Sequence, residues 1–200
     1  MIPMPSHRKK SDTVVILALG NPGEDYESTY HNAGVIALPA VIKVWAGEEA
    51  DALTWRTHKH LFEYASAGDF IFARSLTYMN ESGIAAAEVL KKFDIPADRL
   101  TVLHDESDLM IGDYKISFDR NSGGHKGAQS TIDHLKTKTF WRVRIGIRPV
   151  SAKAAAGTTA QRKKAGDFVL SRISAAARKA ILTAAERAAQ ELAQKCADKR

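Results

Sequence analysis

Hydrophobic positions along the chain alternate between short continuous runs and runs at helical spacing. The run TVVILALG, residues 13–20, is apolar without alternation, which predicts a strand buried on both faces. In residues 28–47 apolar side chains recur at helical spacing, which predicts a helix with Ser28 or Thr29 as its N-cap. Pro39 lies within this pattern, so we expect a kink there or the start of the regular helix.

The rest of the chain continues this alternation of strands and helices. Residues 61–67 and 70–76 flank Gly68-Asp69, which is typical of a β-hairpin. Further helices are expected over residues 81–93, 127–136 and 174–195. Further strands are expected over residues 99–105, 113–119 and 140–149. This order predicts a single α/β domain in which helices flank a mixed β-sheet.

Two segments have the composition of loops. Residues 1–12 carry basic side chains but no apolar run of signal-peptide form after them, so we expect a flexible tail followed by one domain over residues 13–200. Residues 151–166 are expected to form a mobile loop. No apolar run approaches the roughly 20 residues that a membrane helix needs, so no membrane partner is expected.

Composition and charge narrow the class of protein. Cys196 is the only cysteine, which excludes an intramolecular disulfide framework and a cysteine metal cluster, and fits a reducing cytoplasm. Residues 20–110 hold 7 Lys/Arg against 15 Asp/Glu, whereas residues 113–200 hold 19 against 7. Such a basic half is expected of a protein that binds a polyanion, although basic solvated helix faces would give the same count.

Polar side chains stand where the predicted strands end. Asn21 follows the first strand, Asn80 follows the hairpin, and Asp105 ends the strand over residues 99–105. His31 stands near the start of the first helix. Ligands of open α/β sheets bind beyond the carboxyl ends of the strands, so these side chains can converge on one site.

Each of these residues also has a purely structural interpretation. Asn21 could be a turn residue, His31 an interior histidine, Asn80 a helix N-cap and Asp105 a turn cap. A metal site built on Asp105 and its neighbour His104 is disfavoured, because adjacent residues on a strand point to opposite faces. The chain has no G-x-S-x-G motif, which disfavours an α/β-hydrolase esterase. The four residues alone therefore indicate only a possible hydrolytic site.

Five motifs follow one another along the chain: GNPGEDYESTYHNAG, LTYMNESG, LHDESDLMIGDYKIS, GGHKG and FWRVRIGIRP. In this order and at these separations they resemble the bacterial-type peptidyl-tRNA hydrolase family. The resemblance runs from about Thr13 to Ile173. It implies a monomeric cytoplasmic enzyme with a twisted mixed sheet between helices. It also implies hydrolysis of the ester between a peptide and the 3′-terminal ribose of tRNA, so the expected partner is peptidyl-tRNA. No cofactor or metal is expected, because a positioned water and a base can suffice to hydrolyse an activated ester.

The resemblance also assigns roles within the motifs. His31 matches the family's general base, and Asp105 matches the carboxylate that orients it and stabilises the imidazolium. Asn21 and Asn80 match amides that hold substrate and water. Tyr26 and Tyr78 fall where the family keeps aromatic groups near the tRNA 3′ end and the peptide. Tyr26 and Tyr78 are therefore also expected to contact the substrate.

Two positions depart from the family's pattern. The glycine loop usually reads Gly-His-Asn-Gly, whereas Lys126 here replaces the asparagine and offers donors and a charge but no acceptor. A basic residue that grips the tRNA phosphate falls at Ser117, with Lys115 two residues away on the same strand face. Its partner arginine matches Arg144. Some relatives bind RNA without hydrolysing anything, and Lys126 keeps that alternative open although His31 and Asp105 favour an enzyme.

Overall fold

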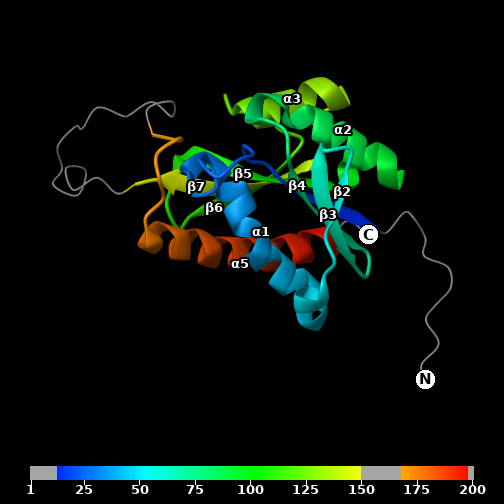
Figure 1. Cartoon of the computed structure of the whole chain (residues 1–200), viewed down its shortest axis with the longest axis horizontal. Coiled ribbons are helices and arrows are strands. Elements are labelled where there is room, and N and C mark those ends of the chain that lie inside the picture. The colour runs from blue at the N-terminus through cyan, green and yellow to red at the C-terminus, as the bar shows by residue number, and fades with distance from the viewer. Residues whose placement is uncertain (1–12, 150–167, 198–200) are drawn as a thin grey trace.

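A seven-stranded sheet forms the centre of the fold (Figure 1). The computed structural model describes residues 13–149 and 168–197. The expectations of a flexible tail over residues 1–12 and of a mobile loop over residues 151–166 lie outside the described residues. None of the helices in the described part of the chain combines the length and the apolar character needed to cross a membrane.

The sheet is mixed, as the sequence predicts. Its strands are β1 (Val14–Ala18), β2 (Arg56–His58), β3 (Phe62–Ala67), β4 (Phe70–Ser75), β5 (Leu100–Met110), β6 (Tyr114–Phe118) and β7 (Trp141–Arg148). Their spatial order is β2-β3-β4-β1-β5-β7-β6. The central strands β4, β1, β5 and β7 run parallel, while β2, β3 and β6 pair antiparallel at the two edges. The carboxyl ends of the four parallel strands therefore lie along one edge of the sheet.

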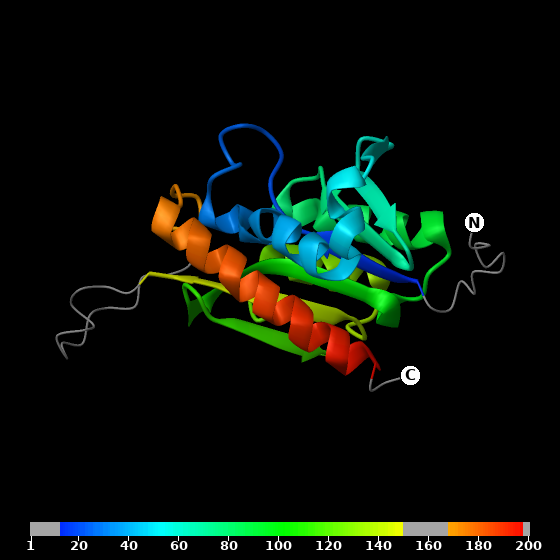
Figure 2. The same cartoon turned by 90° about the horizontal axis from the view of Figure 1, so that it is seen from below.

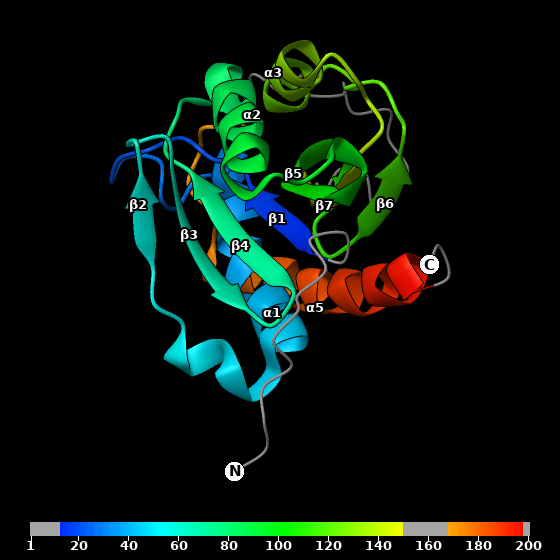
Figure 3. The same cartoon turned by 90° about the vertical axis from the view of Figure 1, so that its right-hand side faces the viewer.

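Helices cover both faces of this sheet (Figure 2 and Figure 3). The α-helices are α1 (Ala33–Ala46), α2 (Ser82–Phe93), α3 (Lys126–Leu135) and α5 (Ala175–Ala197). Short 3₁₀ turns are η2 (Tyr30–Asn32), η3 (Gly47–Ala52), η4 (Met79–Glu81) and η5 (Ala97–Arg99). α1 packs with α5 on one face, and α2 packs with α3 on the other. The predicted α/β class and layering are thus confirmed.

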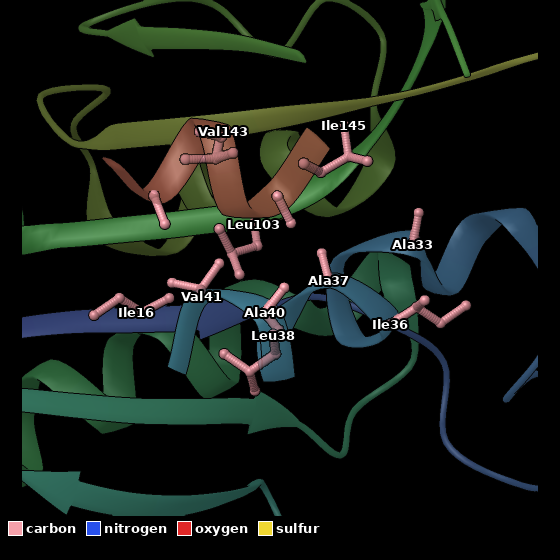
Figure 4. Packing of buried hydrophobic residues seen from close by; sticks show 14 of the residues in the cluster. Ile16, Ala33, Ile36, Ala37, Leu38, Ala40, Val41, Leu103, Val143 and Ile145 are labelled. Carbon is pink, nitrogen blue, oxygen red and sulfur yellow. The ribbon is translucent and has the colours of Figure 1, made fainter. Parts of the chain in front are cut away.

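The position of β1 inside the sheet explains why apolar and polar residues do not alternate along its sequence. All five residues of β1 are buried, and successive side chains enter different hydrophobic clusters on the two faces of the sheet. Ile16 faces α1, where it lies among Ala37, Val41 and Leu103 of β5 (Figure 4). Leu17 faces α2. A strand between two helical layers needs an apolar side chain at every position.

Some local expectations differ from the structure. Thr29 occupies the N-cap position of η2, which leads directly into α1, and Asn32 occupies that of α1 itself. The Thr29 hydroxyl does not cap the turn but donates to the carbonyl of Tyr26 at 2.8 Å. Pro39 lies inside α1 at an exposed position, so the helix carbonyl that it leaves without a donor can be hydrated. The strand β2 and the turn η3 were not predicted. β2 consists of three polar residues and η3 is a short acidic segment, so neither shows the hydrophobic periodicity of a strand or a helix.

Candidate functional site

A cavity of about 530 Å³ lies at the carboxyl edge of the parallel strands. Its walls come from the loop after β1, from η4, from β5, from the start of α3 and from the segment that precedes α5. The lining residues include Asn21, Tyr26, His31, Asn80, Asp105, His125, Lys126 and Leu170. The structure therefore brings Asn21, His31, Asn80 and Asp105 together at one cavity, as the sequence predicts. The expectation that the strand ends at Asp105 is wrong, because β5 continues to Met110. Asp105 instead lies just beyond the residues of β5 that pair with β1.

His31 is paired with Asp105. Its Nδ1 atom lies 2.8 Å from Oδ1 of Asp105, and the two side chains are 13% and 3% exposed. Close packing brings the two residues together, because a Cβ on Gly34 would lie only 2.4 Å from the carbonyl oxygen of Leu103. The glycine lets the start of α1 approach the backbone of β5. His31 is thus positioned by a contact that only glycine permits.

His125 makes a second contact to the same carboxylate. Its Nε2 atom lies 2.7 Å from Oδ1 of Asp105, and its side chain is 9% exposed. Its Nδ1 atom accepts a hydrogen bond from the backbone N–H of Ala128 at 3.1 Å and so caps α3. Because Nδ1 accepts, the proton of the neutral ring must lie on Nε2, which donates to Asp105. Sequence reasoning treated this histidine only as part of the glycine loop.

The charge state of Asp105 follows from these two contacts. Burial alone would raise the pKa of this carboxyl, but electrostatic attraction and hydrogen bonds from the His125 and His31 rings outweigh burial and hold the pKa well below its usual range. An ionised carboxylate only accepts hydrogen bonds, so His31 donates through Nδ1. The Nε2 atom of His31 is left with its lone pair, which is the state that a general base requires.

The same three side chains could approach a metal ion. Ligand atoms of His31, Asp105 and His125 lie within 4.8 Å of one another. Nδ1 of His31 and Nε2 of His125 already bind Asp105, so an ion held through these two atoms would have to replace both hydrogen bonds. The sequence expectation of a metal-free site remains a prediction for a chelation experiment.

Asn21 is held from three directions. Its side-chain oxygen accepts a hydrogen bond from the backbone N–H of Met79 at 2.8 Å. Its backbone N–H donates to Oδ1 of Asn32 at 2.8 Å, and its carbonyl accepts from Nδ2 of Asn32 at 3.0 Å. With the oxygen engaged, the amide nitrogen is the group of Asn21 that remains to donate. Sequence reasoning gave no role to Asn32, although it directly follows His31 and is only 3% exposed.

The remaining side chains on this wall are more open. Asn80 lines the cavity but is exposed, and neither η4 nor α2 uses it as an N-cap. Tyr26 lines the cavity, whereas Tyr78 is 53% exposed and meets Tyr26 edge to face with ring centroids 6.4 Å apart. The two tyrosines form one aromatic ridge at the cavity mouth.

Lys126 is the first residue of α3. It lines the same cavity as Tyr26 but comes from a segment far from the two tyrosines in the sequence. It is exposed, and no carboxylate pairs with it among the described residues. Gly123 and Gly124, which precede it, have φ values of +67° and +86°. These left-handed conformations favour glycine and set the path of the loop that carries His125 and Lys126.

The basic residues of β6 and β7 are arranged by antiparallel pairing. Lys115 faces Arg144 across the two strands, and Ser117 faces Arg142. Arg144 is bound by Glu106, with Nε 2.8 Å and Nη2 2.6 Å from the same carboxylate oxygen. Lys115 is exposed, whereas Ser117 is 8% exposed. The exposed cation on this strand face is therefore Lys115.

Arg142 has a different role from the one its charge predicted. It is only 2% exposed, and its guanidinium donates to the carbonyl oxygens of Asn121 and Ser122 at 2.6 and 3.3 Å. Burial, together with the charge of Arg144, lowers the pKa of Arg142 to about 10. Arg142 belongs to the basic half of the chain, which the charge count assigned to polyanion binding, but it instead holds the glycine loop.

The segment before α5 completes the site. The backbone N–H of His31 donates to the carbonyl of Val169 at 2.7 Å, and that of Tyr30 donates to Ser171 at 3.2 Å. Tyr30 and Phe168 are in edge-to-face contact. Val169 and Leu170 also line the cavity. This arrangement ties the start of the helical region around His31 to a part of the chain far away in sequence.

Comparison with known proteins adds family relationships to this geometry. The model of the family described as peptidyl-tRNA hydrolase matches residues 15–200. The peptidyl-tRNA hydrolase of Geobacillus thermodenitrificans is 35% identical over 178 residues, which cover 88% of each chain. That of Mycobacterium ulcerans is 34% identical over 186 residues, covering 90% of this chain and 88% of the relative. The crystal structure of peptidyl-tRNA hydrolase from Acinetobacter baumannii superposes with a TM-score of 0.71 at 26% identity, covering 93% of this chain and 88% of that one.

Proposed function

The chain belongs to the peptidyl-tRNA hydrolase family, and on that premise we infer how its site hydrolyses the ester between a peptide and the 3′-terminal ribose of tRNA. The observation that supports the mechanism most directly is the pairing of His31 with ionised Asp105 at 2.8 Å beside the cavity. It leaves an imidazole lone pair for water. An ester is already activated, so a positioned base and water suffice for its hydrolysis.

The first step is attack by water. Nε2 of His31 takes a proton from the water molecule as its oxygen attacks the ester carbonyl carbon, and the carbonyl π electrons move onto the carbonyl oxygen. The imidazolium that forms is stabilised by the carboxylate of Asp105, which receives its Nδ1–H. The tetrahedral intermediate then carries the former water oxygen and an oxyanion.

Asn21 stabilises the oxyanion. Its side-chain oxygen is engaged by Met79, so its Nδ2–H₂ group is the donor that can face developing negative charge. A preorganised donor of this kind contributes on the order of 2.7–4 kcal/mol to the barrier in comparable sites. The two backbone bonds from Asn32 keep Asn21 in place during the reaction.

The second step releases the tRNA. The oxyanion re-forms the carbonyl, the bond to the 3′-ribose oxygen breaks, and the imidazolium of His31 returns its proton to that oxygen. The products are a tRNA with a free ribose hydroxyl and a peptide with a free carboxylic acid, which loses the second proton of the water molecule to solvent. His31 is thereby neutral again, and the cycle needs neither a covalent nucleophile nor a cofactor.

The surroundings support an orientation for the substrate. Lys115, Lys126 and Arg144 provide positive charge on the β6–β7 and α3 side, where phosphates of the tRNA acceptor end would lie. The ridge of Tyr26 and Tyr78 offers aromatic faces on the other side for the terminal base or the peptide. We further propose that Asn80 contacts the substrate from η4, and that the enzyme acts as a monomer in the cytoplasm.

One assay tests this function. Purified protein should release tRNA from a defined peptidyl-tRNA, and a metal chelator should leave the rate unchanged. Binding of the substrate without release would support the alternative of an inactive RNA-binding relative. Release that stops with the chelator and returns with added metal would instead assign the His31–Asp105–His125 cluster to a metal ion.

A further inference from the structure

His104 is a buried histidine beside the site that the mechanism above does not use. It precedes Asp105 on β5 and is fully buried, at 0% exposure. Its Nδ1 atom lies 2.7 Å from the backbone carbonyl oxygen of Asp105. Burial, followed by the neighbouring His125, lowers the pKa of His104 well below the usual value, so the ring is neutral. A carbonyl only accepts, so Nδ1 carries the proton and donates.

The topology of the sheet explains why this carbonyl needs a donor. The carbonyl of Leu103 accepts from the backbone N–H of Leu19, at 2.9 Å, on the β1 side of β5. Backbone groups of alternate residues in a strand point to the same neighbour, so the carbonyl of Asp105 also points to that side. β1 ends at Ala18, two residues before the chain turns away toward Asn21. His104 supplies the hydrogen bond that a longer β1 would have made.

His104 also contacts the second donor of the site. The rings of His104 and His125 have centroids 4.3 Å apart at an interplanar angle of 51°. His125 in turn donates to Oδ1 of Asp105. The buried ring of His104 therefore contacts both the backbone of Asp105 and the side chain of His125, which binds the Asp105 carboxylate.

The surroundings of Nε2, the other ring nitrogen of His104, indicate that Nδ1 is the atom that the site needs. Nε2 is buried and has no hydrogen-bond partner in the described part of the chain. An unpaired buried nitrogen is unfavourable, and an apolar side chain of similar size would avoid it. A purely space-filling role would thus be better served by another residue.

We propose that His104 is a positioning residue of the hydrolytic site, which fixes the backbone of Asp105 through its Nδ1–H and the ring of His125 by contact. The proposal rests on the hydrolytic function inferred above. It predicts that the loss of the Nδ1 donor lets the carboxylate move relative to His31. Such a displacement lowers kcat and leaves the binding of tRNA, and hence KM, nearly unchanged.

Three substitutions separate the nitrogen from the shape of the ring. In His104→Asn the amide nitrogen can occupy the place of Nδ1, whereas in His104→Gln it reaches only toward the place of Nε2. His104→Phe keeps a ring and removes both nitrogens. We expect the asparagine variant to retain kcat within about fivefold, and the glutamine and phenylalanine variants to lose about 10- to 100-fold in kcat at similar KM. Equal kcat for the asparagine and glutamine variants, or wild-type kcat for the phenylalanine variant, would overturn the proposal.

A measurement without substrate keeps this test independent of activity. Nuclear magnetic resonance of wild-type protein labelled with ¹⁵N-histidine should show His104 as the neutral Nδ1–H tautomer, with a ring proton protected from exchange. The Nε2–H tautomer would overturn the proposal even if hydrolysis is robust. Conversely, a protein that shows the Nδ1–H tautomer but never releases tRNA would count against the hydrolytic function alone. Thermal unfolding of each variant shows whether lost turnover reflects lost fold.

Discussion

His31 and His125 bind the same oxygen atom of one carboxylate, at 2.8 and 2.7 Å from Oδ1 of Asp105. Only His31 is free to gain a proton, because a proton on Nδ1 of His125 would break its hydrogen bond to the N–H of Ala128 at the start of α3. The shared oxygen therefore supports one imidazolium, and the helix cap determines which ring forms it. This division of roles underlies the first two predictions.

His31→Ala should abolish most hydrolysis while the fold and tRNA binding persist. Removal of a positioned general base costs about 10²- to 10⁴-fold in rate. His60→Asn is a suitable control, since His60 is exposed on the β2–β3 turn with φ of +55°, a conformation that asparagine tolerates. Single-turnover release of tRNA measures the effect, and a rate within a few-fold of wild type would remove His31 from the mechanism.

Asp105→Asn should keep the shape of the site but lose about 10²- to 10⁴-fold in kcat. An amide can present its NH₂ group to His31, which then holds its proton on the wrong nitrogen. The amide also cannot stabilise the imidazolium with a negative charge. Kinetics over a range of pH measure both effects, and unchanged kcat and pH profile would leave Asp105 with only a structural role.

Asn32→Ala tests whether the support of Asn21 matters for turnover. The change leaves the backbone N–H and carbonyl of Asn21 without their partners and should lower kcat by about 10- to 100-fold. Ser130→Ala is the matched control, because it removes the buried hydrogen bond that the Ser130 hydroxyl accepts from the N–H of Gly83, between two residues that do not line the cavity. Both variants should lose about 1–3 kcal/mol in free energy of unfolding. Similar kcat in the two would show that Asn32 serves stability alone.

Arg144→Ala should weaken tRNA binding rather than chemistry. We expect KM to rise about tenfold and the slope of log affinity against log salt concentration to fall by about 1. Glu106→Gln is the informative partner variant, because it releases Arg144 from its carboxylate without removing the guanidinium. It should bind tRNA at least as tightly as wild type. A selective fall in kcat in Arg144→Ala, with an unaltered salt slope, would contradict the assignment.

Lys126→Asn should preserve activity and shift the acidic limb of the kcat/KM profile to higher pH. The ammonium of Lys126 lines the same cavity as His31 and opposes a second positive charge there, so its removal makes protonation of the base easier. Lys126→Arg keeps the charge and should leave the limb in place. If the limb does not move in Lys126→Asn, the lysine simply faces solvent. An inactive Lys126→Asn variant would mean that this loop has diverged further from the family.

The sequence predicted those parts of the site that depend on where strands end. Asn21 could be found because ligands bind beyond the carboxyl ends of parallel strands, and His31 because it belongs to the segment that follows Asn21. Asp105 lies at the same edge because β1 ends beside Leu103, although β5 itself continues to Met110. His125 and His104 could not, because their roles depend on which ring nitrogens face Asp105 across the folded chain. Such contacts leave no periodic signal in the sequence.

The same limit applies to predicting which positively charged side chains are exposed. Arg142 and Arg144 are alike in the sequence and alternate along one strand, yet the first is buried against carbonyl oxygens and the second is bound by Glu106. The register of β6 against β7 places Lys115 opposite Arg144, and the packing of the folded chain leaves Lys115 exposed. Residue type set the overall positive charge of this half of the chain, and tertiary packing decided which cations face outward.

The hydrogen bond from the N–H of His31 to the carbonyl of Val169 has a consequence for biosynthesis. During translation this chain is itself a peptide esterified to tRNA, and so belongs to the chemical class that the enzyme cleaves. His31 emerges from the ribosome early, whereas the acceptor at Val169 and the helix α5 that packs on α1 are still to be made. The surroundings of His31 in the nascent protein thus remain incomplete until most of its synthesis is over.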